Sequence, residues 1–268
     1  MNEQTRQPVI EVEHLVTHYG ARKILDDVSM TVYKGEIMVI MGGSGSGKST
    51  LLRYLLGLHQ PTSGSIKLLG KDITKLSALE MQGLRKNMGV SFQGGALFNS
   101  MNIGENVCLP LREHTTLDEN TMRIMSRMKL EVVNLAGFEN LMPAQLSGGM
   151  IKRAALARAI VMDPKLLFFD EPSAGLDPVA SVELDELILR IRKAMNTTIV
   201  VVTHELDSTF RIADRITVLD QGKILKIGTV EEIRHCDNER IQNLLNRKAR
   251  DNQIDADAYM QRLTADTP

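Results

Sequence analysis

The chain of 268 residues has no apolar run near the ~20 residues that a membrane-spanning helix requires. Its first residues, MNEQTRQPVI, are polar and lack the apolar stretch of a secretory signal peptide. We therefore expect the chain to act on a membrane only through a partner protein. No internal repeat or low-complexity segment occurs, and a hydrophobic content of 43% suffices for one good core with an appended lobe.

Excess charge and clustered cysteine are also missing. The net charge is −1, whereas proteins whose main partner is nucleic acid usually carry a basic stripe, so we expect no nucleic-acid partner. Cys108 and Cys236 lie far apart and not at a metal-ligand spacing. We expect them to be buried or idle thiols in a reducing compartment.

The first informative segment is GGSGSGKS at Gly42–Ser49, which fits the pattern G-x-x-x-x-G-K-[ST] of a loop that surrounds phosphates with backbone N–H groups. An apolar run at 36–41 precedes it and an apolar-periodic run at 49–56 follows. This strand–loop–helix order would place a triphosphate at a helix N-terminus, where free amides and the helix dipole favour anions. A tight turn that happens to be rich in Gly and Ser is the weaker alternative.

The loop predicts several contacts to a nucleoside triphosphate. We expect Lys48 to reach the β- and γ-phosphates and Ser49 to supply a hydroxyl to Mg²⁺. The predicted nucleotide-binding loop comprises Gly42, Gly43, Ser44, Gly45, Ser46, Gly47, Lys48, Ser49 and Thr50.

An acidic pair, Asp170 and Glu171, follows the apolar run Leu166–Phe169. Such an unalternated run is typical of a strand buried on both faces of a parallel sheet, and open α/β sheets bind ligands at the carboxyl ends of their strands. We therefore expect Asp170 to serve Mg²⁺ and Glu171 to orient or deprotonate a water molecule at the γ-phosphate. The pair could instead, or in addition, cap a helix.

The segment LSGGM at Leu146–Met150 is the most discriminating one. Ser147 is predicted to cap the following helix, and Gly148 and Gly149 would let a phosphate approach its exposed N–H groups. A chain with one complete phosphate loop does not obviously need a second helix start of this kind. We interpret the segment as serving a nucleotide that is held by another copy of the chain.

These three segments, in this order, resemble the nucleotide-binding subunits of ABC transporters over about residues 9–233. The resemblance implies an ATPase that binds ATP and Mg²⁺ and works as a homodimer enclosing two nucleotides. It implies that Tyr19 stacks on adenine and that Gln93 touches Mg²⁺ and senses the permease. It further implies that Asp177 lies in a loop crossing the dimer interface and that His204 contacts the γ-phosphate.

A narrower resemblance rests on residues 92–98, 110–115 and 141–160 and on Met150 in LSGGM. These segments are similar to the ATPase subunit of Mla-type phospholipid transporters, bacterial systems that are built around MCE proteins. The resemblance implies phospholipid transport between the inner and outer membranes, maintaining outer-membrane lipid asymmetry. It also implies a position on the cytoplasmic face of the inner membrane. The implied partners are a multi-span permease, an MCE protein and a small STAS-domain protein.

Other functions stay open at this point. An ABC ATPase of a different importer or exporter would carry the same motifs, and cargo is not contacted by such a subunit. A soluble ABC-type ATPase acting on ribosomes or DNA usually has two cassettes or a long coiled-coil insertion, and neither is present. A kinase or GTPase would leave LSGGM unexplained, and the sequence contains no N-K-x-D segment.

The expected fold is α/β, with a P-loop NTPase core of mostly parallel sheet and an N-terminal antiparallel β-subdomain. We expect the ATPase domain at 1–237, with an inserted helical subdomain at about 94–160. The C-terminal extension, 238–268, is polar but carries sparse apolar residues. We expect either a dispensable tail or an arm that docks on another subunit through Ile241, Leu244, Leu245, Tyr259 and Leu263.

Overall fold

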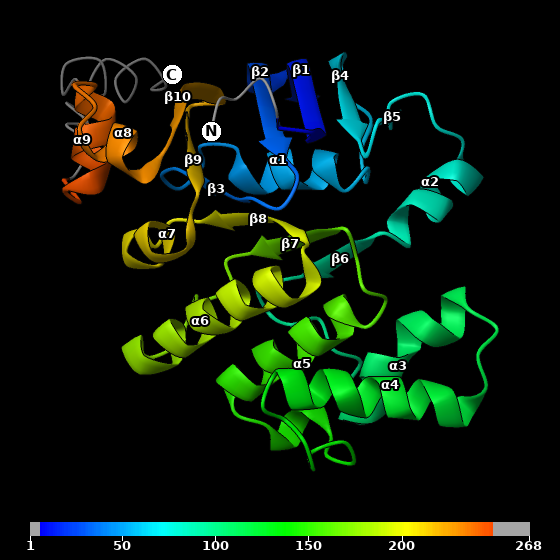
Figure 1. Ribbon diagram of the computed structural model, residues 1–268. Coiled ribbons are helices and arrows are strands. Elements are labelled where there is room, and N and C mark those ends of the chain that lie inside the picture. Colours follow the sequence, from blue (N-terminus) through cyan, green and yellow to red (C-terminus); the bar gives the residue numbers. More distant parts are fainter. Residues whose placement is uncertain (1–5, 249–268) are drawn as a thin grey trace, which may run out of the picture.

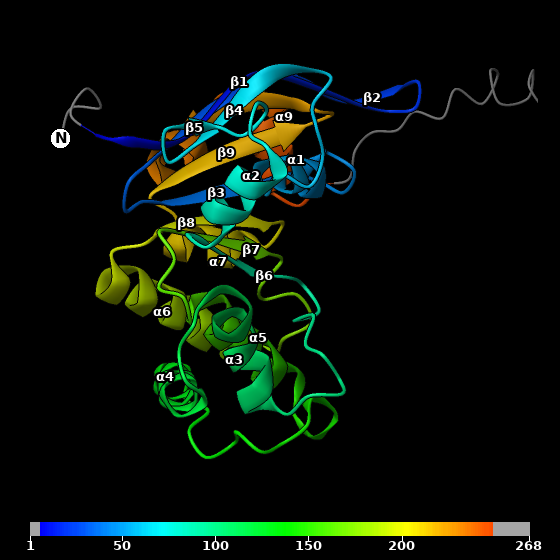
Figure 2. The same ribbon diagram turned by 90° about the vertical axis from the view of Figure 1, so that its right-hand side faces the viewer.

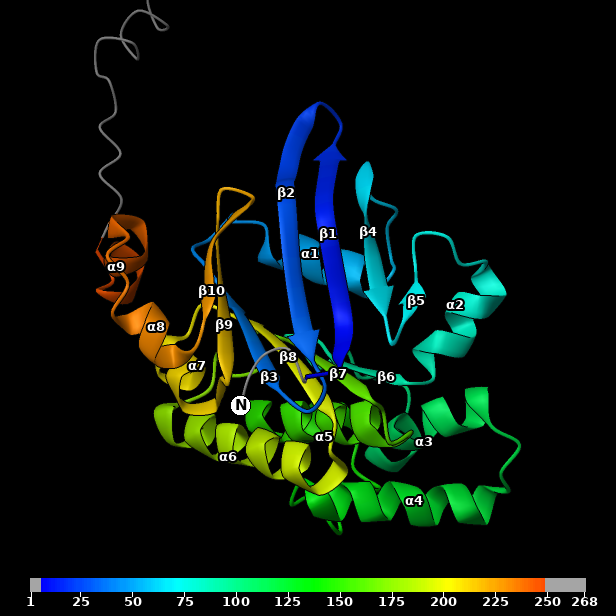
Figure 3. The same cartoon turned by 45° about the horizontal axis from the view of Figure 1, so that its top comes forward.

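The computed structural model describes residues 6–248 and contains two sheets with one helix between them and further helices below (Figure 1). The first sheet is antiparallel, with the strand order β2-β1-β4-β5. Its strands are β1 (Pro8–Tyr19), β2 (Arg22–Tyr33), β4 (Ser63–Leu68) and β5 (Lys71–Asp72). This is the predicted N-terminal antiparallel β-subdomain, and Figure 3 shows its strands side by side.

The second sheet has the order β10-β9-β3-β8-β7-β6 and is parallel except for the final hairpin of β9 and β10. Its strands are β3 (Ile37–Met41), β6 (Met88–Ser91), β7 (Leu166–Asp170), β8 (Thr198–Thr203), β9 (Arg215–Asp220) and β10 (Lys223–Gly228). The predicted fold class, a mostly parallel P-loop NTPase sheet, is therefore confirmed.

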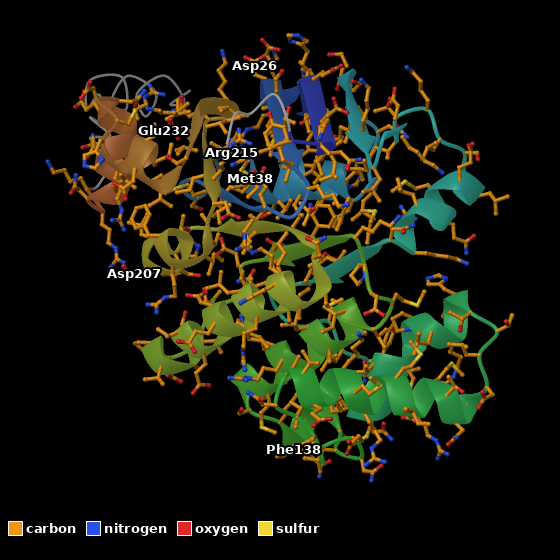
Figure 4. The ribbon with its side chains drawn as sticks, in the orientation of Figure 1. Asp26, Met38, Phe138, Asp207, Arg215 and Glu232 are labelled. Atoms are coloured by element: carbon orange, nitrogen blue, oxygen red, sulfur yellow. The ribbon has the colours of Figure 1, made fainter. Side chains whose placement is uncertain are left out.

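The central strands are buried on both faces, as their unalternated apolar runs predict. In β3, Met38 and Ile40 face a core shared with the antiparallel sheet, while Ile37 and Val39 face a second core. Figure 4 shows the labelled Met38 in the middle of the upper layer. Helix α1 (Lys48–Leu55) fills the first core between the two sheets. Because side chains of β3 are packed into a core on each face of the sheet, the end of β3 and the start of the loop that follows it have a fixed position.

Most of the helices lie on the other side of the parallel sheet. Helix α2 (Ala78–Arg85) precedes β6, and the insertion between β6 and β7 contains α3 (Ile103–His114), α4 (Glu119–Val132), a short 3₁₀ helix (Pro143–Gln145) and α5 (Gly148–Ile160). Figure 2 shows this insertion projecting away from the two sheets. Helices α6 (Pro178–Met195) and α7 (Leu206–Ile212) follow β7 and β8.

The beginning of the C-terminal extension differs from the prediction. Helices α8 (Val230–Arg234) and α9 (Glu239–Leu245) lie beside β10, and Ile241 is fully buried in this chain's own core. Leu244 and Leu245 pack against the same core, so the role of Ile241 as an anchor on another chain is wrong. The amphipathic pattern correctly indicates a covered face, but the cover is intramolecular. Tyr259 and Leu263 lie outside the described residues.

The described residues contain neither a membrane-spanning helix nor a disulfide bond. Within residues 6–248, no helix combines the length and apolar character needed to cross a bilayer. Cys108 and Cys236 are free thiols, the first buried and the second half-buried. Burial raises the pKa of the Cys108 thiol, which agrees with an unreactive side chain.

Candidate functional site

A cavity of about 920 Å³ lies where β3, β7 and β8 end. Four sequence segments that were singled out separately meet here: the phosphate loop, the turn after β6, the turn after β7 and the start of the segment after β8. The predicted residues that line the cavity are Gly42, Gly43, Ser44, Gly45, Lys48, Ser49, Gln93, Glu171 and His204. The fold therefore gathers most of the predicted phosphate-binding and catalytic residues around one space.

The phosphate loop depends on glycine at two points. A Cβ on Gly42 would lie 2.1 Å from the carbonyl oxygen of Leu219, so a side chain cannot fit there. Gly47 has φ +107°, a backbone conformation that favours glycine, and it precedes α1 without a side-chain cap. The first N–H groups of α1 are therefore free of a competing side-chain acceptor, as anion binding requires.

The buried ammonium group of Lys48 sits at the bottom of the loop. It donates hydrogen bonds to the carbonyl oxygens of Gly42, at 2.8 Å, and Gly43, at 3.1 Å. Burial lowers its pKa, and the charges of Glu171 and Asp170 oppose that shift. A buried cation that is held only by neutral carbonyls is well prepared to bind a phosphate.

Asp170 offers an oxygen atom that fits a cation. Its Oδ1 is buried and has no hydrogen-bond partner in the described chain, which is costly for a carboxylate. Burial, with a smaller effect of Glu171, raises the pKa of Asp170. No cluster of three or more His, Cys, Asp or Glu side chains suited to a metal ion occurs among residues 6–248. The unpartnered Oδ1 of Asp170 fits Mg²⁺, which is typically bound by one or two carboxylates together with phosphate oxygens.

Glu171 is held by the end of the neighbouring strand β8. Its Oε2 accepts hydrogen bonds from the hydroxyl of Thr203 at 3.0 Å and from the backbone N–H of His204 at 3.4 Å. Its Oε1 lies 2.8 Å from Nδ1 of His204. The helix-cap alternative for the acidic pair is excluded, because the next helix, α6, begins later and is capped by Asp177.

Tyr19 lies beside the phosphate loop, at the end of β1. Together with Arg22 and Ile24 it lines a hollow of about 260 Å³ whose other wall is formed by residues 45–50. Tyr19 is 44% exposed, and its ring meets the ring of His59 edge-on. A flat ring with an open face at this position can stack on a base whose phosphates occupy the loop. Ser46 and Thr50, two predicted loop residues outside the larger cavity, line this hollow.

The LSGGM segment is not part of the phosphate cavity. Ser147 caps α5 by accepting a hydrogen bond from the N–H of Met150 at 3.3 Å, as predicted. Ser147, Gly149 and Met150 line a separate hollow of about 220 Å³. Apart from its chain neighbours and the backbone of its own helix, no described atom lies within 4 Å of the position that a Cβ on Gly148 would take, so that helix start faces open space. The structure thus does not bring Ser147, Gly148, Gly149 or Asp177 to this chain's own phosphate loop.

The cavity also has walls that the sequence did not indicate. It is also lined by residues in and just after α9: Asn243, Leu244, Arg247 and Lys248. Arg247 forms an ion pair of 3.5 Å with Asp207, which Figure 4 labels on α7. These residues belong to no motif, so only the packing of α9 could have revealed them. Thr203 belongs to no motif either, and its contact with Glu171 exists only because β7 and β8 pair.

Comparisons with known proteins agree with this geometry. The family model "ABC transporter" matches residues 25–174. The "Intermembrane phospholipid transport system ATP-binding protein MlaF" of Haemophilus influenzae is 44% identical over 239 residues, which cover 89% of this chain and 90% of that protein. The "Probable ribonucleotide transport ATP-binding protein mkl" of Mycobacterium tuberculosis is 41% identical over 237 residues, or 88% of this chain and 66% of that protein.

A solved dimer, "Dimeric Structure of MJ0796, a Bacterial ABC Transporter Cassette", superposes with a TM-score of 0.77 at 30% identity. The alignment covers 82% of this chain and 98% of that one. The same cassette has also been solved in a post-hydrolysis state bound to ADP and Pi, with a TM-score of 0.75. The chain therefore belongs to the ABC transporter family and is an ATP-hydrolysing cassette.

Proposed function

We propose that this ATPase powers phospholipid transport between the inner and outer membranes through a separate multi-span permease. The ATPase part of the proposal rests on one observation: a single cavity joins the phosphate loop, Gln93, Glu171 and His204. The transport part is supported by the 44% identity to a protein named for intermembrane phospholipid transport, with about nine-tenths of both chains aligned.

In the proposed reaction Lys48 exchanges its carbonyl partners for the β- and γ-phosphate oxygens of ATP. Ser49, Gln93 and Asp170 would hold Mg²⁺, which when bound neutralises charge on the phosphates. Tyr19 stacks on the adenine ring. The amides of the loop hold the phosphates at the start of α1, so the substrate is fixed before hydrolysis.

Glu171 is the proposed general base. Its carboxylate accepts the proton of the attacking water, while Thr203 and the backbone of His204 keep it in place. The His204 ring, 56% exposed at the edge of the cavity, contacts the γ-phosphate. Each side chain thereby acts at a distance fixed by the adjacent ends of β7 and β8.

The second half of the proposed site comes from another copy of the chain. Ser147 and Gly149 line a hollow apart from the phosphate cavity, the Cα of Gly148 faces open space, and Asp177 caps helix α6. A homodimer that encloses two ATP molecules would bring each such helix start to the other copy's γ-phosphate. The similar cassette that was solved as a dimer supports this arrangement.

The proposed partners are the permease, an MCE protein and a small STAS-domain protein, with the chain on the cytoplasmic face of the inner membrane. Residues beyond 248 are proposed to contribute a docking arm to this assembly. The near-neutral charge gives no support for nucleic acid as a partner.

The test is to purify the tagged full-length chain from detergent-solubilised membranes and to reconstitute the complex in liposomes. We expect a co-purifying multi-span protein and ATP-dependent transfer of a fluorescent phospholipid. The same preparation with Lys48→Ala should transfer none. Recovery with ribosomes or DNA, and no membrane protein, would refute the transport proposal.

Ribonucleotide transport is a second candidate, because the mycobacterial relative carries that name at 41% identity. That alignment covers 66% of the relative, against 90% for the phospholipid-transport protein, so we prefer the phospholipid proposal. The liposomes decide between them: ATP-driven movement of a labelled ribonucleotide, with no lipid transfer, would favour the second candidate.

A further inference from the structure

The backbone of Glu171 adopts a conformation that its side chain disfavours. Its φ is +47°, in the left-handed region that residues other than glycine rarely occupy. The next residue is Pro172, whose ring further restricts the backbone of the residue before it. Strain of this kind persists only where the surroundings hold it in place. Something must therefore stabilise the turn that carries the proposed general base.

The ammonium group of Lys152 contacts this turn directly. It donates a hydrogen bond of 2.6 Å to the carbonyl oxygen of Pro172 and one of 3.3 Å to that of Glu171. The two carbonyls belong to the two consecutive peptide units that follow the Cα of Glu171, so one cation holds the backbone directly after the strained residue. The Glu171 carbonyl accepts a further hydrogen bond, from the N–H of Ala174 at 3.2 Å.

The two backbone carbonyls explain the position of the Lys152 side chain. Among residues 6–248, the hydrogen bonds of its nitrogen go to these two carbonyls, and the side chain is half-buried. Burial lowers its pKa, while the charge of Glu171 opposes the shift. Removing part of the water around a lysine ammonium group costs free energy. A role in solubility alone therefore does not explain why Lys152 turns inward to bind two backbone carbonyls.

Lys152 also belongs to the helix that begins with LSGGM. It lies about one turn beyond Ser147 on α5, while the turn that it holds follows β7. Helix α5 packs against β6, the neighbour of β7 in the sheet, and Figure 1 shows it on the lower side of that sheet. The lysine is thus a physical link between the start of α5 and the carboxylate that Thr203 and His204 orient.

We propose that Lys152 is a positioning residue for hydrolysis: it holds the backbone of Glu171 so that the carboxylate faces the attacking water. This inference rests on the proposed role of Glu171 as the general base. It predicts that loss of the ammonium group lowers kcat and leaves nucleotide binding close to normal, because the phosphate loop does not contact Lys152.

The test uses full-length chains with Lys152→Met, which keeps most of the side-chain length, and Lys152→Arg, which keeps the charge. We expect Lys152→Met to lower kcat by about 10–100-fold, the effect of a displaced catalytic group, with little change in affinity for a fluorescent ATP analogue. Lys152→Arg should restore most of the rate. Lys129→Met is the matched control, since Lys129 is also a largely covered helical lysine but pairs with the exposed Asp163.

A double variant separates positioning from a general loss of structure. If Lys152 acts through Glu171, adding Lys152→Met to Glu171→Gln should lower the rate no further. A multiplied loss, a parallel loss of nucleotide affinity, or full activity of Lys152→Met would overturn the proposal. Should Lys152→Met fail to fold, Lys152→Gln, which removes the charge but keeps a donor, is measured in the same cycle.

Failure of this inference can be told apart from failure of the proposed function. If the wild-type chain hydrolyses ATP and Glu171→Gln does not, the function stands whatever Lys152→Met does. If Glu171→Gln keeps normal turnover, the assignment of Glu171 as general base and the role of Lys152 fall together, while the transport proposal is still decided by the liposome experiment.

Discussion

At the scale of single residues, the site is organised around the Glu171 carboxylate. Both of its oxygens are engaged by Thr203 and His204 at the end of β8. Replacing it with Gln keeps the shape and removes the base. We therefore expect Glu171→Gln to slow hydrolysis by on the order of 10²–10⁴ with ATP binding retained.

The measurement is steady-state ATP turnover alongside titration with a fluorescent ATP analogue. Lys48→Ala is the comparison: it should lose affinity together with activity, because a buried cation and its phosphate contacts are removed. Normal turnover by Glu171→Gln would show that another group activates the water.

Asp185 provides a pH-dependent test of stability away from the site. It is buried on α6, accepts a hydrogen bond of 2.5 Å from the hydroxyl of Ser208 and lies 3.5 Å from Arg211. Burial raises the pKa of Asp185, and its contacts with Ser208 and Arg211 only partly oppose the shift. The folded state therefore holds the proton more tightly than the unfolded state does. Its contribution to stability is present at low pH and is lost as pH rises through the folded pKa.

Asp185→Asn should remove that slope and be at least as stable as the wild type at neutral pH. Asp185→Ala should instead lose about 1–3 kcal/mol, because the buried Ser208 hydroxyl is left without its acceptor. Urea unfolding at a series of pH values measures both effects. An unchanged pH slope in Asp185→Asn would contradict the assignment.

Whether a site residue can be predicted from the sequence depends on whether its position is set by neighbouring residues in the chain. The positions of Lys48 and Glu171 in the cavity were predictable, because each stands at a fixed offset from a glycine loop or an apolar strand. Thr203 and Lys152 were not, because their relation to Glu171 exists only after β7, β8 and α5 have packed. A lysine on a polar helix surface and one that binds two carbonyls look the same in a sequence.

At the scale of elements, helix α9 packs on this chain's own core, where the sequence suggested contact with another subunit. Its apolar residues recur at helical spacing, which correctly predicts a covered face. The covering surface could not be predicted, because the same pattern serves an intramolecular core and a partner chain equally well. The structure places Ile241 in the core beside β9 and α8.

We expect Ile241→Ala to destabilise the chain by about 2–5 kcal/mol, the usual cost of truncating a buried Ile. Leu245→Ala, at a half-buried position on the same helix, should cost less. Chains ending after residue 237 or after residue 248 separate folding from assembly. The first should lose stability in urea unfolding, whereas the second should fold normally and assemble more weakly with its partners in native mass spectrometry. Equal stability of the two would contradict the packing of α9.

At the scale of the whole molecule, the two helix starts that we propose to bind phosphate lie in separate hollows of one chain. The sequence already suggested that the two helix starts serve different nucleotides, since one chain has no evident need for two phosphate-binding segments at one site. The account therefore requires that every complete site contain Lys48 from one copy and Ser147 from the other.

The most direct test mixes two inactive variants, Lys48→Ala and Ser147→Arg. In a mixed dimer one site carries both defects, and the other carries neither, so ATP hydrolysis should rise above that of either variant alone. As a control, adding more of the same variant should leave activity unchanged. The account predicts partial recovery on mixing. Activity that only equals the sum of the two separate variants, although mixed dimers are seen in native mass spectrometry, would contradict the shared site.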